Sequence, residues 1–175
     1  PAEGDWALLR EAQSMAARDL PDVGIAVTTD IGDARDIHPR NKREVGRRLG
    51  LWALAEAYDR PTEGYESPSL EKAEKVAGPD GGSAMRITFN QTGAGLKTRD
   101  EKAPNGFALS GPDGKFQWAN AKIEDGGRSV LVWSADVPDP AGVCFAWQNN
   151  PVRANLVNSA GLPADPFKAK LSSRR

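Results

Sequence analysis

The sequence has few of the residues that form disulfides and bind transition metals. Its 175 residues include one cysteine, Cys144, and one histidine, His38. A single cysteine excludes an internal disulfide framework and a cysteine-rich zinc site. One histidine among loop carboxylates is also a poor ligand set for zinc. Cys144 stands between a valine and a phenylalanine, so we expect a small, buried, apolar side chain there.

An excess of charge and a long apolar run are also lacking. The chain carries 23 basic and 24 acidic residues and a formal net charge of -1. This balance argues against a nucleic-acid-binding protein, which needs a basic surface to contact phosphates. No apolar run is long enough to cross a membrane, and no signal peptide is visible. With 39% hydrophobic residues, the sequence supports a packed core rather than bulk disorder.

The first 60 residues predict a helix, a strand and a second helix. Residues 23–29, VGIAVTT, are typical of a strand buried on both faces of a parallel sheet. For the second helix, Asn41 and Glu44 have capping-box spacing, and Glu44 and Arg48 form a favourable i,i+4 pair. Residues 4–19 have helical periodicity. The expected face of that first helix consists of Trp6, Leu9, Gln13 and Ala16.

Beyond residue 68 the hydrophobic period changes to two. Residues 85–89 and 129–133 alternate apolar and polar side chains, and residues 143–147 do so less regularly. Clusters of glycine, proline and aspartate lie between them. Short strands separated by such turns predict an antiparallel sandwich or barrel. We therefore expect an α/β piece over residues 1–60, a linker over 61–68, and an all-β domain resembling a sandwich over 69–175.

The α/β piece predicted for residues 1–60 lacks sheet partners. A strand buried on both faces needs neighbouring parallel strands, and this chain supplies none nearby. The sequence also starts with proline rather than methionine. We therefore expect a C-terminal piece of a larger domain, with apolar surface exposed on the predicted strand and the nearby helix faces.

The chain's only histidine lies in the loop DIGDARDIHPRNK, residues 30–42. His38 would follow the carboxyl end of the predicted strand, where ligands and catalytic groups collect in open α/β sheets. An imidazole can take a proton from a hydroxyl, and a carboxylate improves it as a base. Asp36 and Asp33 are the nearby candidates. The alternative is a histidine at a helix start or on the surface, with aspartates that form turns.

Residues 28–54, TTDIGDARDIHPRNKREVGRRLGLWAL, resemble the catalytic-histidine segment of the sialate O-acetylesterases. These are serine esterases of the SGNH type with a flavodoxin-like α/β catalytic domain. The stretches MRITFNQTGAGLKTRD, GFALSGPDGKFQWANAKIE and FAWQNNPVRANLVNSAGLPADPF are similar to the β-rich C-terminal portion of the same enzymes. The resemblance extends from about residue 6 to residue 167.

The resemblance implies that His38 is the catalytic base and that Asp36 is its acidic partner, with Asp33 as second choice. The wider SGNH pattern places the acid three residues before the histidine, where this chain has Arg35. The implied reaction removes O-acetyl groups from sialic acid or a related acetylated sugar through an acetyl-enzyme, without a cofactor or metal. A secreted or periplasmic parent protein is also implied.

The nucleophile that this reaction needs is not recognisable in the chain. The family carries a Gly-x-Ser-Asn-like motif and its oxyanion-binding groups in N-terminal blocks, and no such motif occurs here. We interpret the serines as turn or surface residues. The resemblance therefore implies that the chain supplies base and acid to a serine in a missing N-terminal part, and that it is inactive alone. The alternative is a non-catalytic carbohydrate-binding or accessory β-module.

Two further groups of side chains could bind a sugar. Arg40 could contact an anionic sugar beside the loop, but basic residues near a helix start more often form a solvated face. We expect the same of Lys42, Arg43, Arg47 and Arg48. The β half contains three tryptophans that could form a stacking platform, and core packing is the favoured interpretation. These are Trp118, Trp133 and Trp147.

Overall fold

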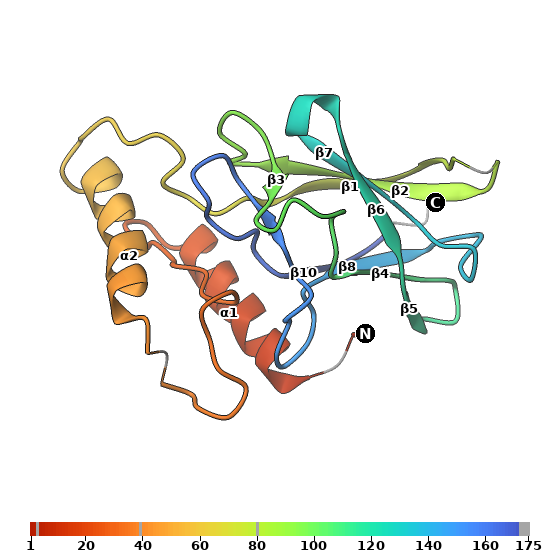
Figure 1. The fold of residues 1–175 in the computed structure, drawn as a ribbon, viewed down its shortest axis with the longest axis horizontal. Coiled ribbons are helices and arrows are strands. Elements are labelled where there is room, and N and C mark those ends of the chain that lie inside the picture. Colours follow the sequence, from red (N-terminus) through yellow and green to blue (C-terminus); the bar gives the residue numbers. More distant parts are fainter. Residues whose placement is uncertain (3, 39, 80, 172–175) are drawn as a thin grey trace.

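The computed structural model describes residues 1–2, 4–38, 40–79 and 81–171. Two helices, α1 (Asp5–Asp19) and α2 (Lys42–Glu56), lie at one end of the molecule, and strands form the rest (Figure 1). An α/β plus β-rich architecture is thus confirmed at this coarse level. Within the described residues, no helix is long and apolar enough to span a membrane.

In the described residues the strands form three antiparallel sheets. The first has the order β1 (Ser69–Ala77), β2 (Ser83–Asn90), β7 (Ser129–Trp133), β6 (Asn120–Glu124). The second has the order β10 (Phe167–Lys170), β8 (Gly142–Phe145), β4 (Phe107–Ser110), β5 (Phe116–Trp118). The third pairs β3 (Lys97–Thr98) with β9 (Leu156–Val157), and a short 3-10 helix, η1 (Asp125–Gly127), precedes β7.

The first two sheets share one hydrophobic core. The ring of Phe167 in β10 lies 5.9 Å from that of Phe89 in β2 and 6.1 Å from that of Phe145 in β8, measured between centroids. Side chains that alternate along each strand point into this core. Its fully buried members include Met85, Ile87, Phe89, Phe107, Leu109, Val130, Val132, Val143 and Phe145.

The predicted strands of the β half are confirmed. Residues 129–133 coincide with β7, and residues 85–89 lie within β2. The third predicted strand, 143–147, is shorter than expected because β8 ends at Phe145. The next residue, Ala146, has a left-handed φ of 52°, which cannot continue an extended strand.

Helix α1 packs on the outer face of the second sheet. Ala7 is fully buried and contacts Ala108, Cys144 and Trp147. The small side chains of Ala108 and Cys144 let the helix approach the sheet closely. Cys144 is 1% exposed, so the expectation of a buried cysteine is confirmed. Burial raises the pKa of its thiol to about 12.

The apolar face of α1 is not the face that packs. Trp6 is 50% exposed and Leu9 47% exposed, and Gln13 and Ala16 on the predicted face are exposed too. The helix is therefore present as predicted, and its apolar face is exposed, as expected for the helix faces of this piece. Polar contacts to the β half hold the opposite side. Arg10 donates to the carbonyl oxygen of Gln148, and Ser14 Oγ donates to Asp165 Oδ1 at 3.0 Å.

The predicted strand over residues 23–29 is wrong. These residues are all described and none of them is in a strand, because the described part of the chain has no neighbouring strand to pair with their backbone. The segment packs on α2 instead. Gly24 lies so close to Trp52 that a Cβ atom there would be 2.2 Å from the indole ring.

The expected exposure of apolar surface in the first 60 residues is confirmed. The structure has twelve exposed large hydrophobic side chains among its described residues, and ten of them precede residue 61. These ten are Trp6, Leu8, Leu9, Met15, Leu20, Val23, Ile37, Leu49, Leu54 and Tyr58. Exposed apolar side chains on a folded chain are thus concentrated in its first 60 residues.

Candidate active site

The loop that carries His38 is built from short-range turns. The amide of Ile31 donates to the carbonyl of Thr28 at 3.2 Å. The Asp33 carboxylate accepts from the amide of Arg35 at 2.9 Å, which is the Asx-turn geometry that aspartate favours. The amide of Asp36 then donates to the carbonyl of Asp33 at 3.3 Å. The aspartates thus shape the loop as turn residues.

Asp36 and His38 form a pair at the end of these turns. Asp36 Oδ1 accepts from the main-chain amide of His38 at 2.9 Å and lies 3.2 Å from Nδ1 of its ring. A carboxylate at Nδ1 favours the tautomer that carries its proton there, which leaves Nε2 able to accept a proton. Of the two aspartates proposed from the sequence, Asp36 is the one within bonding reach. The Asp33 carboxylate has Arg35 as its ion-pair partner instead.

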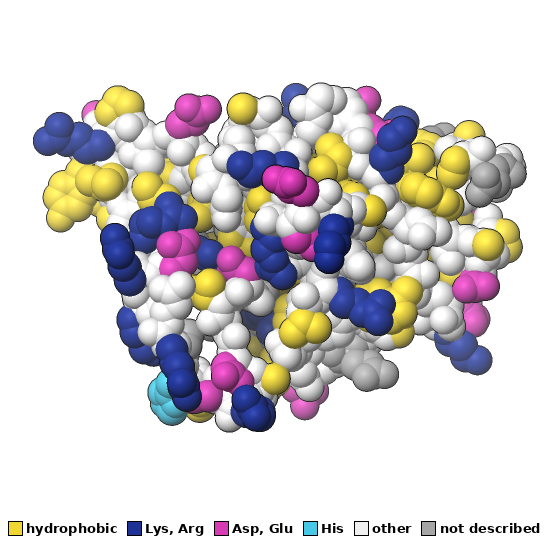
Figure 2. Space-filling model, viewed as in Figure 1, with side chains coloured by type: hydrophobic (Ala, Val, Ile, Leu, Met, Phe, Trp, Pro, Cys, Tyr) yellow, Lys and Arg dark blue, Asp and Glu magenta, His cyan; other side chains and the backbone are white. Residues whose placement is uncertain are grey.

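The Asp36–His38 pair is open to solvent. The His38 side chain is 79% exposed and that of Asp36 is 38% exposed. In Figure 2 the histidine lies at the edge of the molecule, next to acidic and basic side chains. Excluding water from a site strengthens the electrostatic interactions inside it. The described residues alone do not enclose the imidazole.

A cleft of about 270 Å³ adjoins the loop. Asp36 and Ile37 line one side, Trp6 and Arg10 of α1 line another, and the turn at residues 149–151 closes it from the β half. Its volume is near the lower end of the range for small-molecule sites. The sequence gives no sign that residues 149–151 lie beside the loop, because only the packing of α1 on the second sheet brings the two segments together.

The basic residues near the start of α2 divide into two groups. Arg40, Lys42, Arg43 and Arg47 are exposed, as expected for a solvated face. Arg48 is different, because its side chain is only 4% exposed, so the solvated-face interpretation is wrong there. The predicted Glu44–Arg48 pair is present at 2.9 Å. The predicted cap is present in part, since Asn41 accepts from the Glu44 amide at 3.1 Å, whereas the Glu44 carboxylate binds arginines.

The three tryptophans do not form a platform. Trp147 is 4% exposed, in agreement with the core interpretation, and Trp133 is half-buried. Trp118 is 36% exposed, so core packing is wrong for it. The guanidinium of Arg153 lies over its ring, 4.8 Å from the centroid, which makes it a cation–π pair.

The serines have structural contacts of their own. Ser14 donates to Asp165, and Ser129 donates to Asp125 at 2.5 Å. Among the described residues, no serine hydroxyl is hydrogen-bonded to His38. The same part of the chain contains no group of three His, Cys, Asp or Glu side chains placed to hold a metal ion.

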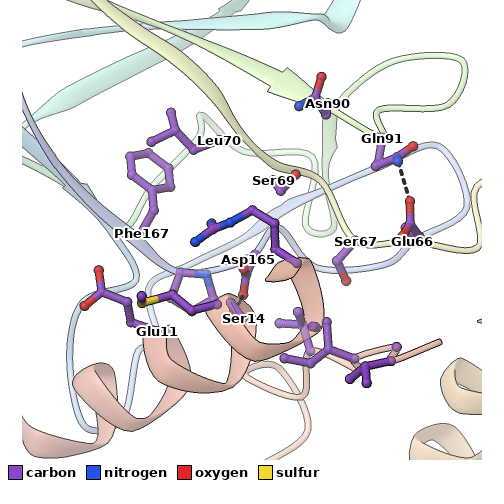
Figure 3. Close-up of a pocket in the computed structure, with 18 of the residues that line it drawn as sticks. Glu11, Ser14, Glu66, Ser67, Ser69, Leu70, Asn90, Gln91, Asp165 and Phe167 are labelled. Atoms are coloured by element: carbon purple, nitrogen blue, oxygen red, sulfur yellow. Dashed lines mark hydrogen bonds between the residues drawn. The ribbon is translucent and has the colours of Figure 1, made fainter. Parts of the chain in front are cut away.

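A larger cavity of about 590 Å³ lies where α1, α2 and the β half meet (Figure 3). Burial raises the pKa of Asp165 to about 6, against the hydrogen bond from Ser14. Burial also raises the pKa of Glu66, with a further contribution from the nearby carboxylate of Glu56. None of the loop residues 28–38 lines this cavity, so it is separate from the His38 loop.

Comparison with known proteins gives relatives of one kind. No family model matches the chain. A sialate O-acetylesterase from Rattus norvegicus is 28% identical over 97% of the chain, and those from Mus musculus and Homo sapiens are each 29% identical over 89%. The chain spans only 32%, 29% and 30% of the length of these three proteins, respectively.

A solved structure shows the same similarity at the level of the fold. A carbohydrate acetylesterase from Xanthomonas citri matches with a TM-score of 0.87 and 40% sequence identity, over 97% of this chain and 37% of that one. The short coverage of the relatives is consistent with a C-terminal part. The chain is therefore similar along nearly its whole length to about a third of a sialate O-acetylesterase, which confirms the resemblance predicted from its sequence.

Proposed function

We propose that this chain is the C-terminal part of a serine esterase that removes O-acetyl groups from sialic acid or a related acetylated sugar. The observation that carries this proposal is the pairing of Asp36 with His38 Nδ1 at 3.2 Å. The similarity to sialate O-acetylesterases and to a carbohydrate acetylesterase supports the class of substrate. The nucleophile would come from another part of a longer polypeptide.

In this mechanism His38 Nε2 accepts the proton of the serine hydroxyl as its oxygen attacks the acetyl carbonyl. Asp36 stabilises the imidazolium that forms. The imidazolium then gives its proton to the departing sugar oxygen, which leaves an acetyl-serine. A water molecule, deprotonated by His38, attacks the acetyl-serine, and acetic acid leaves as His38 returns the proton to the serine oxygen. To accept and later donate these protons at Nε2, the neutral imidazole must carry its own proton on Nδ1. The Asp36 carboxylate favours that tautomer.

The fold proposal is that residues 1–60 are the remnant of an SGNH-type α/β domain and that residues 69–175 form a β-sandwich. Two sheets that share one core support the sandwich. The unpaired 23–29 segment and the exposed apolar face of α1 support the remnant. In a complete α/β domain, the 23–29 segment would pair with parallel strands and the apolar face of α1 would be covered.

The catalytic proposal is tested on the longer polypeptide that contains this stretch. We expect His38→Ala to abolish acetate release from an O-acetylated sialic acid, and Asp36→Ala to reduce it about 10²–10⁴-fold, the usual contribution of a positioned acid–base group. Asp33→Ala is the matched control for the acid. Full activity of the His38→Ala variant would refute the assignment of the base.

Arg40 is proposed as a contact for the sialate carboxylate. If it has this role, Arg40→Ala should raise KM for an acetylated sialic acid by about tenfold, the loss of one charged hydrogen bond, and leave KM for a neutral acetylated sugar unchanged. Arg43→Ala is the control, because Arg43 is exposed on the same helix start. If Arg40→Ala left the KM for the acetylated sialic acid at its wild-type value, or raised both KM values by the same factor, Arg40 would not have this role.

The fold proposal is tested by thiol labelling. Leu9→Cys places a thiol on the exposed face of α1, and Val152→Cys places one in the β half, where Val152 is 70% exposed. Both should react freely in the 175-residue chain. In the longer polypeptide the Leu9 variant should be protected and the Val152 variant should not. If both thiols also reacted freely in the longer polypeptide, the result would favour the alternative, an accessory β-module with a loosely attached helical segment.

A further inference from the structure

Arg48 is the most buried charged group near the His38 loop. Its guanidinium makes two parallel hydrogen bonds to the Asp30 carboxylate, Nη1 to Oδ1 at 2.7 Å and Nη2 to Oδ2 at 2.8 Å. Its Nε donates to Glu44 Oε1 at 2.9 Å, and Nη1 also donates to the main-chain carbonyl of Val27. This fork-to-fork geometry is available to arginine and not to lysine.

These partners lie on both sides of the catalytic loop. Asp30 is at its start, eight residues before His38, and Glu44 is in the first turn of α2, six residues after it. Asn41 caps the same turn by accepting from the Glu44 amide at 3.1 Å. One side chain thus joins the segment that enters the loop to the helix that leaves it.

The middle of the loop has only local hydrogen bonds. Among the described residues 31–38, the side-chain hydrogen bonds join residues two apart: Asp33 accepts from Arg35, and Asp36 accepts from His38. Such bonds fix the shape of a turn but not its position on the rest of the molecule. The described residues 31–37 include several exposed side chains, and Ile37 is 77% exposed. The position of the loop relative to α2 therefore depends on its two ends.

The ion pairs of Arg48 with Asp30 and Glu44 favour the arrangement in which both ends of the loop stay bound to Arg48. Burial by itself lowers the pKa of Arg48, but its hydrogen bonds to the carboxylates of Asp30 and Glu44 raise that pKa above its ordinary value. Glu44 is drawn to a pKa of about 2, mainly by its hydrogen bond from Arg47, with a further contribution from Arg48. Breaking a buried ion pair leaves an uncompensated charge, so the loop cannot leave this position without a penalty.

We propose that Arg48 is a positioning residue for the Asp36–His38 pair, which it holds by tying both ends of their loop through Asp30 and Glu44. The inference extends the proposed function, since a base must be held within a fraction of an ångström to act on a hydroxyl. In this role Arg48 does not need to contact the substrate. The position of the His38 ring can also be followed by NMR without any reaction, because the chain has only one histidine and its ring signal is unambiguous.

The first test is made on the 175-residue chain by NMR. Arg48→Met removes the charge and keeps much of the length, and Arg48→Lys keeps the charge but not the fork. Asp30→Asn keeps the shape of the partner. The control is Arg47→Met, because Arg47 also binds Glu44 but its side chain is 43% exposed. Each spectrum contains a single histidine ring Hε1 signal, which reports on His38 alone.

We expect Arg48→Met and Asp30→Asn to move the His38 ring signal towards its value in an unfolded peptide. Amide exchange over residues 31–38 should speed up about tenfold or more, as a loop that opens locally does, while β2 and β7 stay protected. Arg48→Lys should be intermediate and Arg47→Met unchanged. An unchanged ring signal and unchanged loop exchange in Arg48→Lys and Asp30→Asn would overturn the proposal, whether or not Arg48→Met folds.

The second test uses acetate release by the longer polypeptide. Arg48→Lys should lower kcat about 10- to 100-fold, the effect of a small misplacement of a catalytic group, with KM within about twofold. If His38→Ala abolishes activity and Arg48→Lys leaves kcat unchanged, the positioning role is wrong and the esterase proposal stands. If His38→Ala stays active while the loop loosens in the Arg48 variants, the esterase proposal is wrong and the tie between the loop ends stands.

Discussion

The Asp36 carboxylate contacts His38 twice through the same oxygen. Oδ1 accepts the main-chain amide of His38 at 2.9 Å and lies 3.2 Å from ring Nδ1. The hydrogen bond from the His38 amide holds the Asp36 carboxylate close to the His38 side chain. The same oxygen can therefore orient the ring through Nδ1. Two residues that are two apart in sequence thus form this pair through local contacts alone.

A first prediction concerns the tautomer of His38. Asp36 should keep the proton of the neutral imidazole on Nδ1. Nitrogen-15 NMR at a pH where the ring is neutral should therefore show mainly the Nδ1–H form, and Asp36→Ala should shift it towards the Nε2–H form. Asp33→Ala, the control, should leave the mixture unchanged. A larger change in the Asp33 variant would reverse the order of the two candidate acids.

A second prediction concerns pH and Asp165. Its pKa of about 6 in the folded chain compares with about 3.9 in an unfolded chain. Because the folded pKa is raised, the stabilisation is complete below about pH 4 and is lost as pH rises through about 6. The Asp165→Asn variant has no carboxyl group there and should not lose this stability as pH rises. The difference in free energy of unfolding, variant minus wild type, should therefore increase by on the order of 1–2 kcal/mol between pH 4 and pH 7.

The control for Asp165 is Asp136→Asn, because Asp136 is an exposed carboxylate in the β half. Urea unfolding at both pH values measures the free energies. Comparison with wild type at each pH is necessary, since Glu44, with its pKa of about 2, has the opposite dependence. A difference that stays constant with pH in Asp165→Asn would contradict a buried, weakly acidic Asp165.

A third prediction concerns the contact between α1 and the second sheet. Ala7 is fully buried against Cys144, so Ala7→Leu overfills the contact and should cost about 1–3 kcal/mol. The helix should detach more often, and Cys144 should then react faster with a thiol reagent. Leu8→Ala is the control, because Leu8 is 56% exposed. Labelling of Cys144 at equal rates in both variants would show that α1 does not cover it.

A fourth prediction concerns the start of α2. Asn41 Oδ1 satisfies the amide of Glu44, so Asn41→Ala should reduce the free energy of unfolding by about 1 kcal/mol, as is typical for a lost cap. Asn41→Asp, which keeps the acceptor and adds a charge favourable at a helix start, should leave stability equal or higher. Thermal unfolding measures both, and equal losses in the two variants would argue against the cap.

Much of the fold follows from local pattern. The alternation in residues 129–133 depends only on which side chains the strand buries, and β7 has those bounds. The helix over Asp5–Asp19 and the cap at Asn41 are likewise determined by neighbouring residues. The 23–29 segment shows the limit of this reasoning, because a strand forms only where another strand is present to pair with it.

The side of α1 that packs could not be predicted from its apolar periodicity. The apolar face is the larger hydrophobic surface, yet in this chain it is Ala7, Arg10 and Ser14 that meet the β half. Burial of Arg48 was missed for a related reason. Asp30 lies 18 residues away, and nothing in a helical periodicity shows that the two would meet.

The sequence alone determined the helices, the main strands of the β half, the turn-forming aspartates and the proximity of Asp36 to His38, because each depends on residues close together in the chain. The tertiary structure decided which face of α1 is covered, which arginine is buried and what adjoins the loop. Those outcomes depend on contacts between segments far apart in sequence, whose free energies exist only once the chain has packed.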